Sequence, residues 1–99
     1  MFYVYILYCE NSDLFYVGST NDFERRLAEH NNHEKNKFTS RHDLWELKLV
    51  LAFTSRTEAM QMEKFIKKQK SRSFIEKLII GENLTGKLAQ LVRVPHVRD

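Results

Sequence analysis

Two runs of aromatic and β-branched residues, joined by a short turn, set the strongest limit on how this chain folds. Residues 2–8 are apolar at every position, which is typical of a strand buried on both faces of a sheet. A turn-forming cluster at residues 11–13 follows, and residues 14–19 again have strand composition. Because so few residues separate the two runs, we predict that they pair as an antiparallel hairpin.

A helix and a third strand are predicted after the hairpin. Several N-cap oxygens precede residues 23–30, which have helical spacing, so this helix is expected to begin near Asp22 and to end at the following two asparagines. Residues 33–43 are polar and mixed in charge, which is typical of a long loop that carries contacts. Residues 46–54 alternate at first and end fully apolar, which predicts a strand.

Two further helices are predicted in the second half of the chain. Ser55 and Glu58 have the spacing of a capping box, so a helix is expected to begin there and to reach about Lys70. A last helix is expected to run to Ile80, with Gly81 as its stop.

These elements describe one α/β (α+β) domain with a small, mostly antiparallel three-stranded sheet flanked by helices, in the order ββαβαα. A chain of 99 residues suffices for one hydrophobic core but not for two. We place the domain at residues 1–83 and expect residues 84–99 to form a partly ordered C-terminal tail.

Composition and charge limit the expected cellular location and the expected class of partner. Cys9 is the single cysteine, and the sequence has neither a secretory leader nor a membrane-spanning apolar run, so we expect a cytoplasmic protein without a membrane partner. The net charge is +3, yet residues 64–77 hold six Lys or Arg residues against one Glu. Such a segment is expected for a polyanion partner, although a solvated helix face would have the same composition.

Several short motifs occur in order along the chain. They are YVY at residues 3–5, YVG at residues 16–18, DFERRLAEH at residues 22–30 and the single residue Glu63 on the next helix. Together they resemble the ordered motifs of the GIY-YIG nuclease superfamily, over about residues 3–80. Residues 37–41 are similar to a loop of its small, stand-alone bacterial members.

The resemblance implies hydrolysis of a phosphodiester bond. That reaction needs an activated water, stabilisation of charge on the phosphoryl oxygens and help for the leaving oxygen. Tyr5 and Tyr16 are candidate base and water-positioning groups, because a nearby cation such as Arg26 favours the phenolate. His30 is a candidate proton relay, and Arg26 would bind the scissile phosphate. Glu63 would be the one protein carboxylate on Mg²⁺, with Mn²⁺ as a substitute.

We therefore expect a metal-dependent endonuclease with nucleic acid, in the first place DNA, as its partner. Candidate nucleic-acid-binding residues, chosen from charge alone, are Lys37, Arg41, Lys67, Lys68 and Lys70. Asn83 matches a late asparagine of the family only loosely. No nucleotide cofactor is expected, since the chain has no glycine-rich phosphate loop. The sequence does not indicate which oligomeric state the protein adopts.

Alternatives remain open for the residues and for the whole protein. Arg26 could pair with Asp22 or Glu29, and the tyrosines could simply pack within strands. Glu63 could pair with Lys67 one helical turn later. The domain could also bind nucleic acid without cutting it, or bind other proteins on a nuclease scaffold. Ser19 stands where some family members have a lysine, which argues against lysine-assisted activation of a tyrosine.

Overall fold

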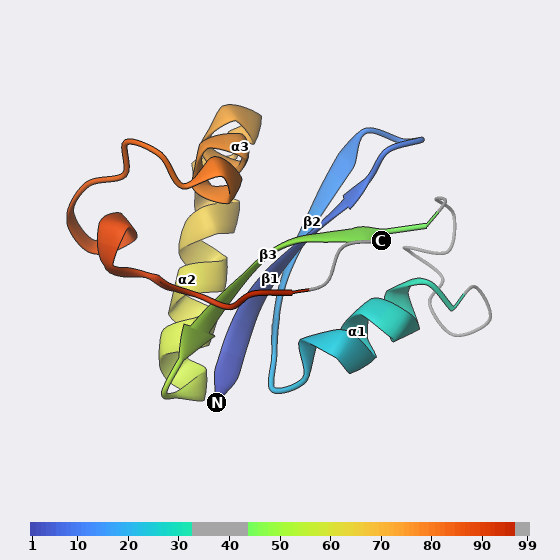
Figure 1. The fold of residues 1–99 in the computed structure, drawn as a ribbon, viewed down its shortest axis with the longest axis horizontal. Coiled ribbons are helices and arrows are strands. Elements are labelled where there is room, and N and C mark those ends of the chain that lie inside the picture. Colours follow the sequence, from blue (N-terminus) through green and yellow to red (C-terminus); the bar gives the residue numbers. More distant parts are fainter. Residues whose placement is uncertain (33–43, 97–99) are drawn as a thin grey trace.

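The computed structural model describes residues 1–32 and 44–96. A strand hairpin, a helix, a third strand and two further helices follow one another, and a short C-terminal segment returns to the sheet (Figure 1). The elements are β1 Phe2–Cys9, β2 Leu14–Thr20, α1 Phe23–His30, β3 Glu46–Phe53, α2 Arg56–Gln69, α3 Arg72–Ile80, the 3₁₀ helix η2 Gly86–Gln90, and β4 Val92–Arg93.

The sheet has the strand order β2-β1-β3-β4, and each neighbouring pair is antiparallel. The predicted hairpin is confirmed, with Tyr5 of β1 opposite Gly18 of β2. The expected number of three strands is wrong, because β4 adds Val92 and Arg93 to the edge of β3. A strand of two residues has no alternation that a sequence pattern could reveal. It forms because the returning chain meets unpaired backbone groups of β3.

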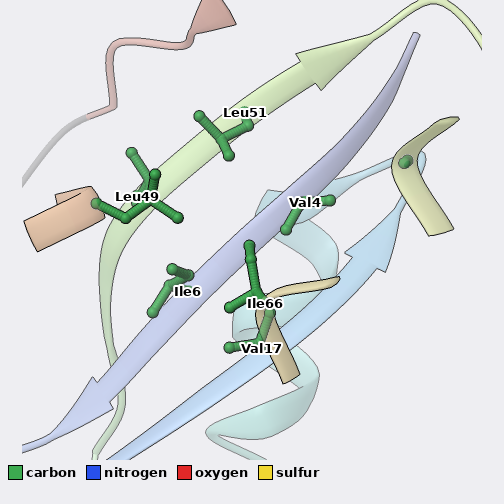
Figure 2. Packing of buried hydrophobic residues seen from close by; sticks show 8 residues of the cluster. Val4, Ile6, Val17, Leu49, Leu51 and Ile66 are labelled. Carbon is green, nitrogen blue, oxygen red and sulfur yellow. The ribbon is translucent and has the colours of Figure 1, made fainter. Parts of the chain in front are cut away.

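Helices cover both faces of this sheet (Figure 1). On one face, side chains of three strands pack against α2 and α3 (Figure 2). The buried members of this cluster are Val4, Ile6, Val17, Leu49, Leu51, Ala59, Ile66 and Leu78. On the other face, Phe23 and Leu27 of α1 pack against a second buried cluster that includes Tyr5, Leu7 and Trp45. Since neighbouring residues of a strand point to opposite faces, β1 is buried on both sides, as predicted.

Side-chain caps fix the helix boundaries. The Asp22 carboxylate accepts a hydrogen bond from the Arg25 amide of α1, and the Ser55 hydroxyl accepts one from the Glu58 amide of α2. Gly81 ends α3 with a φ of 77°, a left-handed conformation that glycine adopts easily. The predicted starts and stops are therefore confirmed. α2 is 14 residues long, and none of the helices in the described ranges is both long and apolar enough to span a bilayer.

The segment after α3 ties that helix to the sheet. The Arg93 guanidinium of β4 donates hydrogen bonds to the carbonyl oxygens of Leu78 and Ile79, which are among the last residues of α3. These carbonyl groups have no partner within the helix itself. Farther along, His96 Nε2 lies 3.0 Å from the carbonyl oxygen of Leu47 in β3. The C-terminal segment thus packs along the outer edge of the sheet as far as residue 96.

Candidate active site

A buried pair of polar side chains forms the centre of the candidate site. The Tyr5 hydroxyl lies 3.1 Å from Nε2 of His30, and each residue is 1% exposed. Tyr16 of β2 packs on both, with ring centroids 4.4 Å from His30 and 6.2 Å from Tyr5. Strands β1 and β2 and helix α1 therefore bring three predicted site residues together.

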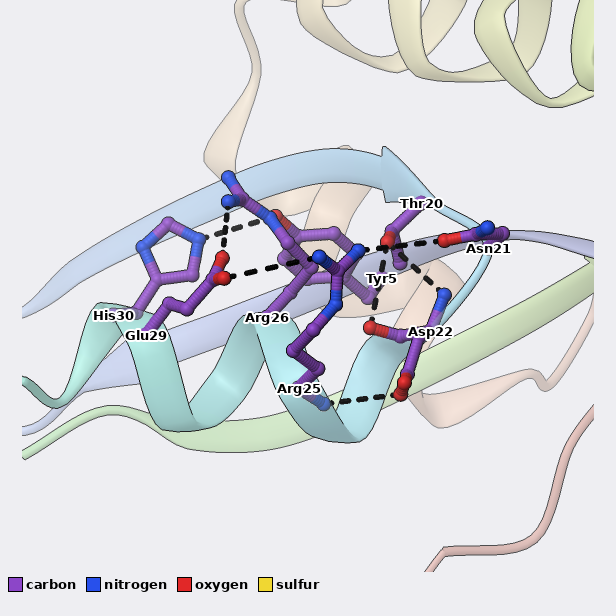
Figure 3. A network of polar contacts seen from close by, with 8 residues as sticks. All are labelled: Tyr5, Thr20, Asn21, Asp22, Arg25, Arg26, Glu29 and His30. Carbon is purple, nitrogen blue, oxygen red and sulfur yellow. Dashed lines mark hydrogen bonds and ion pairs between the residues drawn. The ribbon is translucent and has the colours of Figure 1, made fainter.

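Arg26 of α1 joins this group from the side of the solvent. It lies one helical turn before His30, and the two side chains border Tyr5 (Figure 3). Its Nη1 donates to Glu29 Oε1 at 2.6 Å, which is one of the pairings considered from the sequence. The Tyr5 hydroxyl and Glu29 both raise the pKa of Arg26, so the guanidinium is charged at every relevant pH.

Burial controls the protonation of Tyr5 and His30. It raises the pKa of Tyr5 to about 12, even though the hydrogen bond and charge of Arg26 act in the opposite direction. Burial, helped by the Arg26 charge, lowers the pKa of His30 to about 4. At neutral pH the pair is therefore a neutral phenol beside a neutral imidazole. The Arg26 charge alone does not produce the tyrosine phenolate in the free protein.

Gly18 makes room for the Tyr5 ring. A Cβ atom at this position would lie 2.5 Å from the Tyr5 hydroxyl oxygen and 2.6 Å from its Cζ, which is closer than real Cβ contacts. Tyr5 and Gly18 are partners in the hairpin register, so the ring crosses β2 directly over the glycine. The close approach of the Tyr5 ring thus explains why a residue without a side chain occupies position 18, in the second motif.

Glu63 approaches β2 from the other face of the sheet. Its Oε1 accepts a hydrogen bond from the Ser19 hydroxyl at 2.6 Å, and its Oε2 lies 2.5 Å from Lys67 Nζ. Because Gly18 faces Tyr5, the next residue, Ser19, faces α2. The charge of Glu63 also acts on Tyr5 and raises the Tyr5 pKa slightly, in addition to the larger effect of burial. The carboxylate thus borders the tyrosine cluster across an edge strand.

The predicted nucleic-acid contacts and the late asparagine are spread more widely. Lys67 is the ion-pair partner of Glu63, so the pairing alternative raised by the sequence is present. Lys68 and Lys70 are exposed at the end of α2, and Asn83 is exposed in the segment after α3. The predicted contacts at positions 37 and 41, Lys37 and Arg41, lie outside the described residues.

A pocket of about 370 Å³ opens beside Arg26. It lies between the end of β2 and the first turns of α1 and α2. Its lining residues are Phe2, Ser19, Thr20, Asn21, Arg25, Arg26, Arg56, Ala59 and Met60. Sequence reasoning missed Arg25 and Arg56. Arg25 could have been noticed as the neighbour of Arg26, but no local signal places the first residue of α2 beside α1.

The site lies within the part of the chain that resembles known proteins. Residues 1–78 match the family model described as the GIY-YIG catalytic domain. UPF0213 protein YazA of Bacillus subtilis is 31% identical over 94 residues, which cover 95% of this chain and 92% of the relative. UPF0213 protein NP_0776A of Natronomonas pharaonis is 41% identical over 80 residues, which cover 81% and 92%.

A second archaeal relative agrees with these matches. UPF0213 protein VNG_2274C of Halobacterium salinarum is 38% identical over 78 residues, which cover 79% of this chain and 99% of the relative. No solved structure gives a significant match. The motif tyrosines, Arg26, His30 and Glu63 all lie inside the matched range. The chain therefore belongs to the GIY-YIG family, and it shares the nuclease-type fold of that family with the UPF0213 proteins of bacteria and archaea.

Proposed function

We propose that this protein is a metal-dependent endonuclease that hydrolyses phosphodiester bonds in DNA or structured nucleic acid. The observation that carries the proposal is the position of Arg26, which faces a buried Tyr5–His30 pair on one side and an open, arginine-lined pocket on the other. A planar guanidinium in this place suits a phosphate through two parallel hydrogen bonds. A phosphate bound there lies next to the Tyr5 hydroxyl.

Tyr5 and His30 can then act as a proton relay. A water molecule attacks the phosphorus atom as its proton passes to the Tyr5 oxygen, while the Tyr5 proton passes to Nε2 of His30. The new P–O bond forms as the bond to the leaving oxygen breaks, and solvent protonates that oxygen. The phosphate itself helps this relay, because its negative charge offsets the Arg26 charge that lowers the pKa of His30. Transfers of this kind contribute about 10²–10⁴-fold to rates.

Glu63 is the residue proposed to hold the metal. Within the described ranges, His, Cys, Asp and Glu side chains form no group of three that could hold an ion. Mg²⁺ nevertheless fits a lone carboxylate, since it keeps several waters and takes further oxygens from substrate phosphates. Lys67 would have to leave Oε2 of Glu63, while Ser19 keeps Oε1 in place. The ion would supply charge for the phosphoryl oxygens and the leaving group.

The Glu63–Lys67 ion pair also favours a second candidate function. With both carboxylate oxygens already engaged, the domain could bind nucleic acid without cutting it. Such a module would bind in a strongly salt-dependent manner and would not respond to Mg²⁺.

Cleavage of labelled substrates separates the two functions. The panel contains single-stranded, duplex, flap and four-way-junction DNA with matched RNA, each with Mg²⁺, with Mn²⁺ or with EDTA. We compare the wild type with Glu63→Gln, and use Glu76→Gln on the exposed face of α3 as the matched control. Metal-dependent cutting that Glu63→Gln abolishes and Glu76→Gln retains supports the endonuclease. Binding without cutting, or equal cutting by all three proteins, overturns it.

A further inference from the structure

Two of the three arginines in the pocket have no role in the proposed reaction. Arg26 is held by Glu29 and faces Tyr5, so it belongs to the catalytic group. Arg25 and Arg56 line the same pocket from the first turns of α1 and α2. They are near in space but 31 positions apart in the sequence. Two helices thus place additional cationic groups beside the site of the scissile phosphate.

The charge of these two arginines is poorly compensated. Arg25 Nη1 is 3.9 Å from Glu29 Oε2, and its Nη2 is 3.4 Å from the side-chain oxygen of Asn21, so both contacts are long. Figure 3 shows the Arg25 guanidinium between Asn21 and Glu29, and the same Glu29 carboxylate also contacts Arg26 at a shorter distance. Arg56 is exposed and has no ion pair with any described residue. Among the residues that the structure describes, no Asp or Glu lines the pocket. An anion is the ligand that relieves this excess of positive charge.

The pocket is larger than one phosphate group needs. Its volume of about 370 Å³ is within the range of ligand sites. Phe2, Ala59 and Met60 add apolar surface to the lining of the pocket, and Met60 is 51% exposed. A phosphate attached to a sugar and a base matches this combination of cations and apolar surface better than an isolated anion does.

We propose that Arg25 and Arg56 bind the backbone phosphate next to the scissile phosphate on the same strand, while Phe2 and Met60 contact the nucleoside between the two phosphates. This inference rests on the proposed function and adds a second contact point to it. One phosphate on Arg26 leaves the strand free to rotate, whereas two phosphates in line fix its direction through the site. The pocket would therefore determine on which side of the cut the enzyme needs an intact strand.

Neutral phosphate replacements test this subsite. A single methylphosphonate is placed in turn at each of the three phosphates on either side of the cleavage position of the preferred DNA substrate. Binding is measured by fluorescence anisotropy in EDTA, so that cleavage plays no part. The proteins are the wild type, Arg56→Gln and Arg25→Gln, with Lys77→Gln on the exposed side of α3 as a control for the loss of one charge. Thermal melting checks that each variant is folded.

The expected result is a matched loss. In the wild type and Lys77→Gln, neutralising one neighbouring phosphate weakens binding about tenfold. Arg56→Gln binds the unmodified strand about tenfold more weakly and loses its response to that one replacement, but still responds at the scissile phosphate. Arg25→Gln behaves similarly, and Arg56→Lys recovers part of the response. If the arginine variants respond at every position as the wild type does, or if the wild type binds no strand, the subsite is refuted.

Different experimental results would refute this inference and the endonuclease proposal. If the wild type cuts DNA but the effect of no phosphate replacement depends on Arg56, the endonuclease proposal stands and the subsite is refuted. If the wild type cuts none of the panel, the replacements are scanned along the strand that binds best. If a replacement at one position then weakens binding in a manner that depends on Arg56, the phosphate subsite is supported and the endonuclease proposal is refuted.

Discussion

The hydroxyl oxygen of Tyr5 and Nε2 of His30 lie 3.1 Å apart inside the protein, where each residue is 1% exposed. Burial keeps both groups neutral, since it raises the pKa of Tyr5 to about 12 and lowers that of His30 to about 4. In the proposed reaction, this pair would move a proton once an anion has reached the Arg26 guanidinium. The proposal thereby couples substrate binding to base activation.

Removing the Tyr5 hydroxyl should stop cleavage without unfolding the protein. We expect Tyr5→Phe to lower the single-turnover cleavage rate by at least about 100-fold, because the proton relay loses its first member. Tyr8→Phe is the matched control, since the Tyr8 hydroxyl donates to Asp13 at the hairpin turn. Equal rates for Tyr5→Phe and Tyr8→Phe would rule out Tyr5 as the base.

Acid should destabilise the protein through His30. Its pKa is 6.5 when exposed and about 4 in the fold, so the unfolded chain binds the proton first as the pH falls. The contribution of His30 to stability is complete above pH 6.5 and declines between pH 6.5 and 4, by at most about 3 kcal/mol. Urea unfolding at several pH values should show a shallower acid slope for His30→Gln than for the wild type. An acid slope of His30→Gln equal to that of the wild type would contradict this prediction.

Alkali should destabilise the protein through Tyr5. Because the pKa of Tyr5 rises from 10.0 to about 12 on folding, the unfolded chain loses its proton first. Stability due to Tyr5 is therefore complete below pH 10 and declines as the pH rises from 10 toward 12. Comparison of the unfolding free energies of the wild type and Tyr5→Phe at pH 9 and 11 tests this. A difference between the two proteins that does not change with pH would contradict it.

A methyl group at Gly18 should disturb the site more than the fold. The Cβ of Gly18→Ala would push the Tyr5 ring away from His30, at a cost of about 1–3 kcal/mol in unfolding free energy. We also expect the pKa of His30, measured by NMR titration, to move back toward 6.5 as the group becomes hydrated. Wild-type stability together with an unchanged His30 titration would show that the ring adapts in place.

Loss of Lys67 should strengthen metal binding. Lys67 Nζ occupies Oε2 of Glu63, so Lys67→Ala frees that oxygen for an ion. We expect the Mg²⁺ concentration for half-maximal cleavage to fall several-fold, with Lys68→Ala, a neighbour without a described ion pair, as the control. If Lys67→Ala instead weakens DNA binding and leaves the Mg²⁺ midpoint unchanged, Lys67 acts as the phosphate contact expected from its charge.

Local patterns predicted the hairpin, the helix caps and the grouping on α1, because each depends on residues close together in the chain. Asp22 and Ser55 cap their helices with neighbouring atoms, and Arg26 and His30 share a helix edge. The pairing between Ser19 and Glu63 spans 44 positions and depends on how α2 packs on β2. No periodicity in the sequence encodes such a contact.

The same reason explains why Arg56 and β4 were missed. Arg56 follows an N-cap serine, and nothing near it in the sequence distinguishes it from other first residues of helices. Its place in the pocket depends on how α1 and α2 pack on the sheet. Arg93 was expected in a tail, but its guanidinium satisfies the carbonyl oxygens that α3 leaves open. Both roles arise from surfaces that exist only after the sheet and helices have assembled.

On the edge strand β2, Tyr16 and Gly18 contact the Tyr5–His30 group on one face, while Ser19, the residue after Gly18, contacts the Glu63 carboxylate on the other. Whether a residue of β2 faces α1 or α2 therefore depends on whether its position is even or odd. Deleting one residue from the middle of β2 would exchange the two sets and send the serine toward α1 and the glycine toward α2, although the composition of the strand would hardly change. The number of residues along this strand, as much as their identity, therefore determines which side chains reach each face.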